Sequence, residues 1–140
     1  MLRLLIVAAA APFLVMGAAH GALTLRDLRR PRAFTPHDPA LREAMRRSGV
    51  RLHPAINLWR AWLGFNLTHS LGLVLFGAAY AYVGVFAPGA FAASPLLQAV
   101  AVLVSATYAA LSVAFFFATP ALGSAAGLAG FVAAAALARA

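Results

Sequence analysis

The chain has 140 residues, of which 64% are hydrophobic, and its formal net charge is +8. A soluble domain is closer to half apolar, so a chain of this length cannot hide such a composition in one water-soluble core, and we expect it to be embedded in lipid. Cysteine is absent, which excludes disulfides, zinc–cysteine sites, iron–sulfur ligation and thiol nucleophiles.

The positive charge is concentrated in one segment. Nine of the eleven arginines and all three acidic residues lie between Arg26 and Arg60, which leaves this Arg-rich segment at about +6 (nine minus three). We expect it to stay on the cytoplasmic side of a membrane and to contact anionic lipid head groups. The predicted head-group contacts are Arg29, Arg30, Arg46, Arg47 and Arg60. No nucleic-acid partner is predicted, because the segment has no groove-reading motif and its aromatic residues do not alternate with the arginines.

Four apolar runs follow one another along the chain, and each reaches or approaches the length needed to cross about 30 Å of hydrocarbon. They cover residues 2–25, 62–86, 96–118 and 121–138. The sequence therefore predicts an all-α fold, a four-transmembrane-helix bundle that forms a single domain over residues 1–140. With the Arg-rich segment inside, the Ala87–Pro95 loop lies outside and the short Ala118–Gly123 turn inside. The expected location is the bacterial cytoplasmic (inner) membrane, with both termini periplasmic.

The first apolar run has a second interpretation. The stretch "MLRLLIVAAAAPFLVMGAAHGA" has a basic start, an apolar middle and small residues near its end, like a secretory signal peptide. Cleavage would place the Arg-rich segment outside, against the positive-inside tendency. We therefore expect the run to be retained as a transmembrane helix.

A short helix is predicted inside the Arg-rich segment, in "HDPALREAMRRSG", from Pro39 to Ser48. Asp38 suits the N-cap, Pro39 suits the first helical position, and Gly49 lies just beyond the end. Three residues form an apolar edge: Leu41, Ala44 and Met45. We expect this amphipathic helix to lie flat on the inner membrane surface, and a solvated loop helix is the alternative.

Polar and small residues form stripes along the predicted spans, and membrane helices pack through such stripes. The stripe of the second span is Trp62, Asn66, His69, Leu73, Phe76 and Tyr80, and that of the third is Gln98, Ala101, Ser105, Tyr108 and Ser112. The first and fourth spans carry Gly17-x-x-x-Gly21 and Gly123-x-x-x-Gly127. At about 1.5 Å per residue, five polar residues share one level in the cytoplasmic half. These candidate ligand-binding residues are His20, Asn66, His69, Tyr108 and Ser112.

Three roles remain open for His20 and His69. The first is interhelical hydrogen bonding, at about 0.6 kcal/mol per contact. The second is ligation of a b-type haem between neighbouring helices, although the usual redundancy of paired histidines in transmembrane cytochromes is missing. The third is a pocket for a quinone, a lipid or another hydrophobic small molecule.

Catalysis has little support in the sequence. No carboxylate lies in a predicted span, and there is no Gly-rich phosphate loop, HExxH motif or nucleophile elbow. His37 and His53 lie beside prolines at the two ends of the short helix and are interpreted as turn residues. We therefore predict no catalytic residue, no metal site and no cofactor, with haem b as the alternative cofactor. Whether the protein is an enzyme is left open, and these observations lean against it.

The strings "RAFTPHDPALREAM" and "LWRAWLGFNLTHSLGLVLFG" carry a resemblance. Over Arg32–Gly77 the chain resembles an uncharacterised family of small four-helix bacterial integral membrane proteins. The resemblance implies a four-span membrane protein and no substrate, cofactor or catalytic residue. We therefore expect a small, non-catalytic integral membrane protein that binds lipid or a hydrophobic ligand, or serves as an accessory subunit of a membrane complex. Ala-rich helices also make a homo-oligomer plausible.

Overall fold

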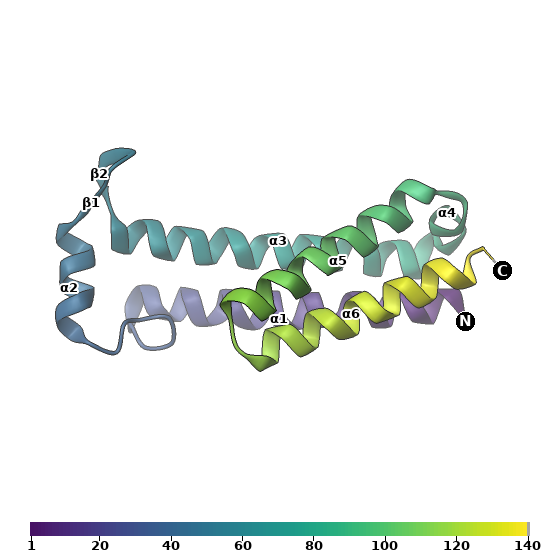
Figure 1. Ribbon diagram of the computed structural model, residues 1–140, viewed down its shortest axis with the longest axis horizontal. Helices are drawn as coiled ribbons and strands as arrows, with labels where there is room; N and C mark the ends of the chain where they lie inside the picture. The colour runs from purple at the N-terminus through teal and green to yellow at the C-terminus, as the bar shows by residue number, and fades with distance from the viewer. Residues whose placement is uncertain (140) are drawn as a thin grey trace. The chain divides into compact units, whose positions relative to one another are not determined.

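The computed structural model describes residues 1–139 of the chain. Within them, six helices and one small sheet follow in this order: α1 (Leu2–Arg29), α2 (Pro39–Arg47), β1 (Gly49–Val50), β2 (His53–Asn57), α3 (Leu58–Phe86), α4 (Pro88–Ala93), α5 (Pro95–Phe115) and α6 (Ala118–Leu137) (Figure 1). The helices α1, α3, α5 and α6 are long and apolar enough to cross a membrane. The predicted all-α bundle with four such helices is confirmed.

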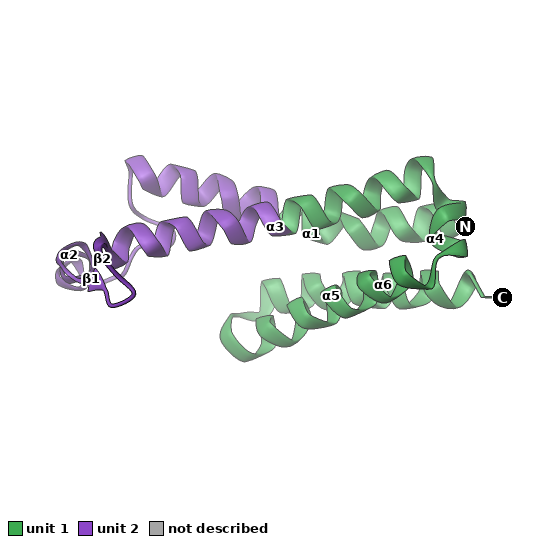
Figure 2. Ribbon diagram, turned by 90° about the horizontal axis from the view of Figure 1, so that it is seen from above, with its two compact units in different colours: residues 1–16, 73–140 green, residues 17–72 purple. Residues whose placement is uncertain are grey.

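The chain forms two compact units, coloured separately in Figure 2. Unit 1 comprises residues 1–16 and 73–140, and unit 2 comprises residues 17–72. Unit 1 therefore contains the first part of α1, the second part of α3, and α4 to α6, whereas unit 2 contains the rest of α1 and α3 with α2 and the sheet. The single domain expected from the sequence stays a prediction.

Two helix ends extend beyond the predicted spans. Helix α1 continues to Arg29, and the arginines of its last turn complement the partial negative charge of the helix C-terminus. Helix α3 begins at Leu58 because the Asn57 side chain accepts a 2.9 Å hydrogen bond from the backbone N–H of Arg60, in the manner of an N-cap.

The predicted turn between the third and fourth spans is wrong in position. The chain reverses at Phe116 and Phe117, which both have extended backbone, and Ala118–Gly123 forms the start of α6. Pro120 fits there because a residue in the first turn of a helix needs no backbone N–H donor.

Helix α2 matches its prediction closely. Its N-cap is Asp38, which accepts a 2.8 Å hydrogen bond from the backbone N–H of Ala40, and Pro39 is its first residue. The sequence does not predict the antiparallel hairpin that follows, which pairs Gly49 with Asn57 and Val50 with His53. Its turn lacks the Asn-Gly or Gly-X pair that marks a two-residue hairpin loop. The sequence also leaves α4 as a loop.

The core of unit 1 is aromatic. The ring of Phe13 packs edge-on against Phe76 at 4.9 Å between centroids, and Tyr80 packs against Phe131 at 5.0 Å. A methyl group on Gly127 would overlap the Phe13 ring, so glycine is required where α6 approaches α1. Most of the predicted stripe of the third span is buried, namely Gln98, Ala101, Ser105 and Ser112. Large apolar side chains face outward, among them Val15, Leu75, Leu103, Val113 and Leu122.

Candidate functional site

Three of the predicted site residues meet in unit 2, between its parts of α1 and α3. The Nε2 atom of His20 lies 2.9 Å from Oδ1 of Asn66, so the ring N–H donates to the amide oxygen. The Asn66 amide nitrogen in turn donates a 2.8 Å hydrogen bond to the backbone carbonyl of Trp62. The imidazoles of His20 and His69 are edge to face, with centroids 5.3 Å apart. Because Asn66 is buried, this polar cluster belongs to the helix–helix contact.

Hydroxyl groups and a glycine complete the contact between the two helices. The Thr24 hydroxyl donates to the carbonyl of His20 at 2.9 Å, and the Ser70 hydroxyl donates to that of Asn66 at 2.8 Å. A methyl group on Gly21 would lie 3.3 Å from Cβ of Ser70, which is closer than ordinary van der Waals contact. The glycine of the predicted stripe therefore lets the two backbones approach at the level of the cluster.

Asp27 organises the chain that leaves α1, a role that the sequence does not predict. It is 1% exposed, and its carboxylate accepts hydrogen bonds from the backbone N–H groups of Arg32 and Ala33 at 3.0 Å and of Phe34 at 2.7 Å. The Thr35 hydroxyl donates to it at 3.3 Å. The available signal was an acidic residue in the last turn of a helix, where the helix dipole disfavours negative charge and another partner is needed.

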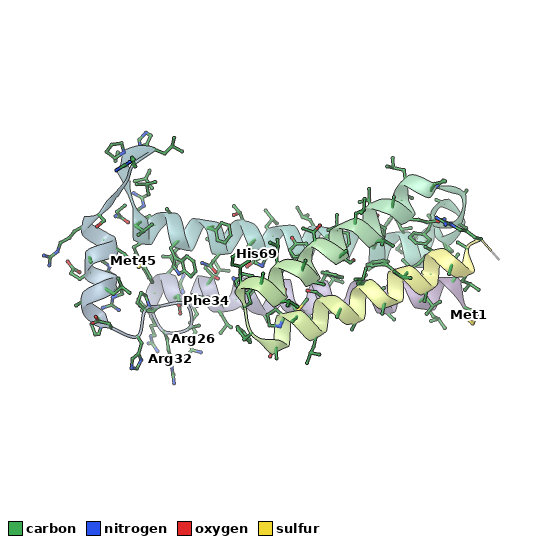
Figure 3. The ribbon with its side chains drawn as sticks, viewed as in Figure 1. Met1, Arg26, Arg32, Phe34, Met45 and His69 are labelled. Atoms are coloured by element: carbon green, nitrogen blue, oxygen red, sulfur yellow. The ribbon has the colours of Figure 1, made fainter. Side chains whose placement is uncertain are left out.

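The loop that Asp27 holds places Phe34 against the polar cluster. The Phe34 ring lies 4.2 Å from the imidazole of His20 between centroids, at an interplanar angle of 33°. The carbonyl of Phe34 accepts a 2.8 Å hydrogen bond from the indole Nε1 of Trp62. Figure 3 shows Phe34 and His69 in the space between the ribbons of α1 and α3. Phe34 thus covers the histidine and joins the loop to α3.

The two other predicted site residues belong to unit 1. The Tyr108 ring lies 5.9 Å from that of Phe13, and Ser112 is buried on α5, where its carbonyl accepts a hydrogen bond from the backbone N–H of Phe116. The partners that the structure gives to His20 and Asn66 come from unit 2 itself. The grouping of Tyr108 and Ser112 with the histidines stays a prediction.

The three carboxylates of unit 2 are all engaged locally. Asp27 binds the loop, Asp38 caps α2, and Glu43 forms a 2.9 Å ion pair with Arg47. Among the described residues 1–139, Arg47 is the sole arginine in a salt bridge with a carboxylate. Eight arginines of unit 2 therefore lack such a counter-charge, namely Arg26, Arg29, Arg30, Arg32, Arg42, Arg46, Arg51 and Arg60.

Two of the arginines on α2 differ from the others. The Nε atom of Arg42 is buried and has no hydrogen-bond partner among residues 1–139. The ion pair of Arg47 is exposed, and exposed pairs contribute at most about 1 kcal/mol. The Arg47 side chain is therefore exposed, and its predicted contact with a lipid head group stays a prediction.

The described geometry does not fit a haem held between the two histidines. Two axial imidazoles lie on opposite faces of a porphyrin, with one nitrogen of each ring on the iron. Here the rings are edge to face at 5.3 Å, and Nε2 of His20 faces Asn66. In residues 1–139, no group of three or more His, Cys, Asp or Glu is arranged to hold a metal ion. The haem b alternative stays a prediction that a spectrum can test.

The fold and the cluster together define an all-α protein with four helices able to cross a membrane and a polar helix contact in unit 2. Comparisons of the chain with protein-family models, with curated proteins and with solved structures give no match.

Proposed function

We propose that this chain is a small, non-catalytic integral membrane protein whose Arg-rich segment, residues 26–60, binds the anionic head groups of the bilayer. The observation that carries the proposal is the state of the three carboxylates in this segment. Each is bound to a local partner, and a single arginine shares in an ion pair among the described residues. Guanidinium groups pair bidentately with phosphate, so lipid phosphates are suitable counter-charges.

The electrostatic attraction between the arginines and anionic lipids is large enough to contribute to membrane binding. Each arginine near an anionic membrane surface contributes about 1 kcal/mol of attraction, which falls off over the Debye length. The head-group contacts predicted from the sequence (Arg29, Arg30, Arg46, Arg47 and Arg60) are all exposed, as this role requires. Leu41 and Ala44 on α2 are exposed as well and offer a short apolar edge to the membrane interface.

The polar cluster supports a structural role for the histidines. Nε2 of His20 and both polar atoms of the Asn66 side chain are engaged in hydrogen bonds, and the nearest acid along α1, Asp27, is occupied by backbone donors. General acid–base catalysis needs a group that is within reach of a substrate and has a proton to exchange. Hydrogen bonding that holds two helices together is the simpler explanation of these contacts.

The proposed location is the inner membrane of a bacterium, with the Arg-rich segment cytoplasmic and both termini periplasmic. The proposal includes membership of the family that residues 32–77 resemble, and it allows a homo-oligomer or a larger membrane complex. Reporter fusions test the orientation. A periplasm-specific enzyme fused after residue 139 should be active, and the same enzyme inserted in the β1–β2 turn should be inactive. The reverse pattern would overturn the orientation.

The lipid preference is tested by thermal unfolding in zwitterionic detergent micelles. Phosphatidylglycerol should raise the Tm because a ligand of the folded state stabilises it, and phosphatidylcholine at the same concentration should not. The increase should shrink with added salt and in Arg30→Gln/Arg46→Gln. Arg3→Gln, outside the Arg-rich segment, serves as the control and should retain the full increase. Equal responses to the two lipids would overturn the proposed function.

A further inference from the structure

The β1–β2 hairpin, residues 49–57, is joined directly to α3. Strand β2 ends at Asn57 and α3 begins at Leu58, so no linker separates them. The backbone N–H of Leu58 also donates a 2.9 Å hydrogen bond to the carbonyl of Ser48, which ties the base of the hairpin to the start of the helix. The hairpin base therefore lies close to the point where α3 enters the membrane.

The start of α3 lies near the expected edge of the hydrocarbon layer. The predicted span begins at residue 62, four residues after Leu58 (62 minus 58), and a helix rises about 1.5 Å per residue, which places the hairpin base about 6 Å outside the hydrocarbon. The head-group layer on each side of a bilayer is about 5–8 Å thick. The base of the hairpin therefore falls within this layer.

The hairpin runs sideways from the helix. Figure 1 shows β1 and β2 projecting from the start of α3 at a steep angle to the axis of its unit 2 part, on the side away from the unit 2 part of α1. Membrane helices are tilted by only about 20° on average from the bilayer normal. A segment that leaves such a helix sideways extends along the membrane surface, over the lipid beside α3.

The side chains of the hairpin suit that surface. Leu52, in the turn, is 94% exposed, and Ile56 is 36% exposed. Arg51 is the neighbour of Leu52 and can keep its guanidinium among the head groups while the leucine reaches deeper. All of β2 except Asn57 is exposed, and an isolated two-stranded hairpin is only marginally stable in water. Contact with a partner outside the hairpin would therefore stabilise it.

Pro54 favours lipid over a second copy of the chain as this partner. A proline has no backbone N–H, so β2 offers an interrupted edge to any third strand. The proline also leaves one donor fewer to be satisfied close to the hydrocarbon, where an unbonded N–H is costly. Acyl chains can cover the exposed leucine without any strand pairing.

We propose that the β1–β2 hairpin is an interfacial anchor, with its backbone among the head groups and the Leu52 side chain between the acyl chains. The contact is hydrophobic, so it requires neither an anionic lipid nor pairing of arginine with phosphate. The inference goes beyond the proposed function, in which arginines bind anionic head groups, because it assigns another residue and another kind of contact. The anchor fixes the depth at which α3 begins.

Electron paramagnetic resonance tests the insertion in the full chain, reconstituted in vesicles of dioleoyl phosphatidylcholine. Because the chain has no cysteine, Leu52→Cys provides a single site for a nitroxide label. The label should collide more often with molecular oxygen, which concentrates in the bilayer, than with a water-soluble nickel chelate. Glu43→Cys is the control and should show the reverse order, because Glu43 lies in an exposed ion pair on α2.

Two results at position 52 would overturn the anchor. More collisions with the nickel chelate than with oxygen would place the hairpin tip in water. Few collisions with either reagent would place it against protein, such as a second copy of the chain.

A second measurement needs no label. In the same vesicles, Leu52→Gln should accelerate amide hydrogen exchange of residues 49–57 by about tenfold, because burial of a leucine side chain stabilises by enough for a factor of this size. Leu41→Gln is the matched control. It removes a leucine that is 53% exposed on α2, and it should leave exchange in the hairpin unchanged. Equal exchange in the wild type and Leu52→Gln would overturn the anchor.

Failure of the anchor and failure of the proposed function give different results, because the anchor does not depend on lipid charge. Insertion of position 52 into phosphatidylcholine, with equal Tm responses to phosphatidylglycerol and phosphatidylcholine, would support the anchor and overturn the proposed function. A label in water, with a Tm raised only by phosphatidylglycerol, would overturn the anchor and leave head-group binding in place.

Discussion

The carboxylate of Asp27 accepts a 2.7 Å hydrogen bond from the backbone N–H of Phe34, seven residues further along the chain. This bond holds the Phe34 ring over His20, and the Phe34 carbonyl then receives the indole N–H of Trp62. One acidic residue at the end of α1 therefore determines how the loop, the histidine and α3 meet in unit 2.

Although Asp27→Asn is an isosteric change, it should destabilise the protein strongly. The asparagine keeps one acceptor oxygen, but its amide NH2 group would face backbone N–H groups, which are donors as well. Hydrogen bonds to a charged group contribute about 1.5–3 kcal/mol, and the substitution removes the charge. We expect the free energy of unfolding to fall by about 2 kcal/mol, measured by denaturation in detergent micelles. The matched control is Asp38→Asn, where asparagine is an equally good N-cap and the change should be small. Similar losses in both variants would contradict the special role of Asp27.

The His20–Asn66 hydrogen bond should appear as coupling in a double-mutant cycle. His20→Leu and Asn66→Leu should each lower the free energy of unfolding by about 1–2 kcal/mol, because each leaves a polar partner unsatisfied. The double variant should lose less than the sum, by about 0.6 kcal/mol, which is typical of polar contacts between membrane helices. Thr68→Val is the control, since Thr68 is exposed and bonds only within α3. If the losses of the two single variants sum to the loss of the double variant, His20 and Asn66 do not stabilise the protein through a shared contact.

Gly127→Ala tests the close approach of α6 and α1 in unit 1. Its methyl group would overlap the Phe13 ring, which is fully buried and in contact with Phe76, so the core has little room to yield. Overpacking of this kind costs about 1–3 kcal/mol, and the Tm should fall accordingly. Gly64→Ala is the matched control, because nothing lies within 4 Å of the added methyl and alanine favours the helix. A Gly127→Ala variant with the same Tm as the wild type would contradict the described packing.

A visible spectrum tests the haem alternative. The protein purified in mild detergent should show no Soret band in either the oxidised or the dithionite-reduced state, because the two imidazoles are too close for a porphyrin and Nε2 of His20 is bonded to Asn66. A Soret band that disappears in His69→Ala would establish the haem and overturn the structural role of the cluster. Mass spectrometry of an organic extract of the same sample would reveal a bound quinone.

Much of the fold could be predicted from the sequence because its causes are local. Length and hydropathy are enough to specify four helices, since every backbone polar group of a lipid-embedded segment must be bonded within the segment. The boundaries of α2 follow from Asp38 and Pro39, which act within one turn. The stripe of Gln98, Ala101, Ser105 and Ser112 marks the buried face of α5 because helical periodicity depends only on spacing.

The tertiary structure decided which polar groups became partners. From the sequence, Asp27 can be recognised only as a negative charge and Phe34 only as an aromatic residue in a loop. Their contacts depend on the path of the chain after α1. The same holds for the local partners of all three carboxylates, which leave eight arginines of unit 2 without a salt bridge to a carboxylate. Periodicity and capping act over a few residues, whereas a hydrogen bond between distant residues exists only once the chain has brought donor and acceptor within about 3 Å.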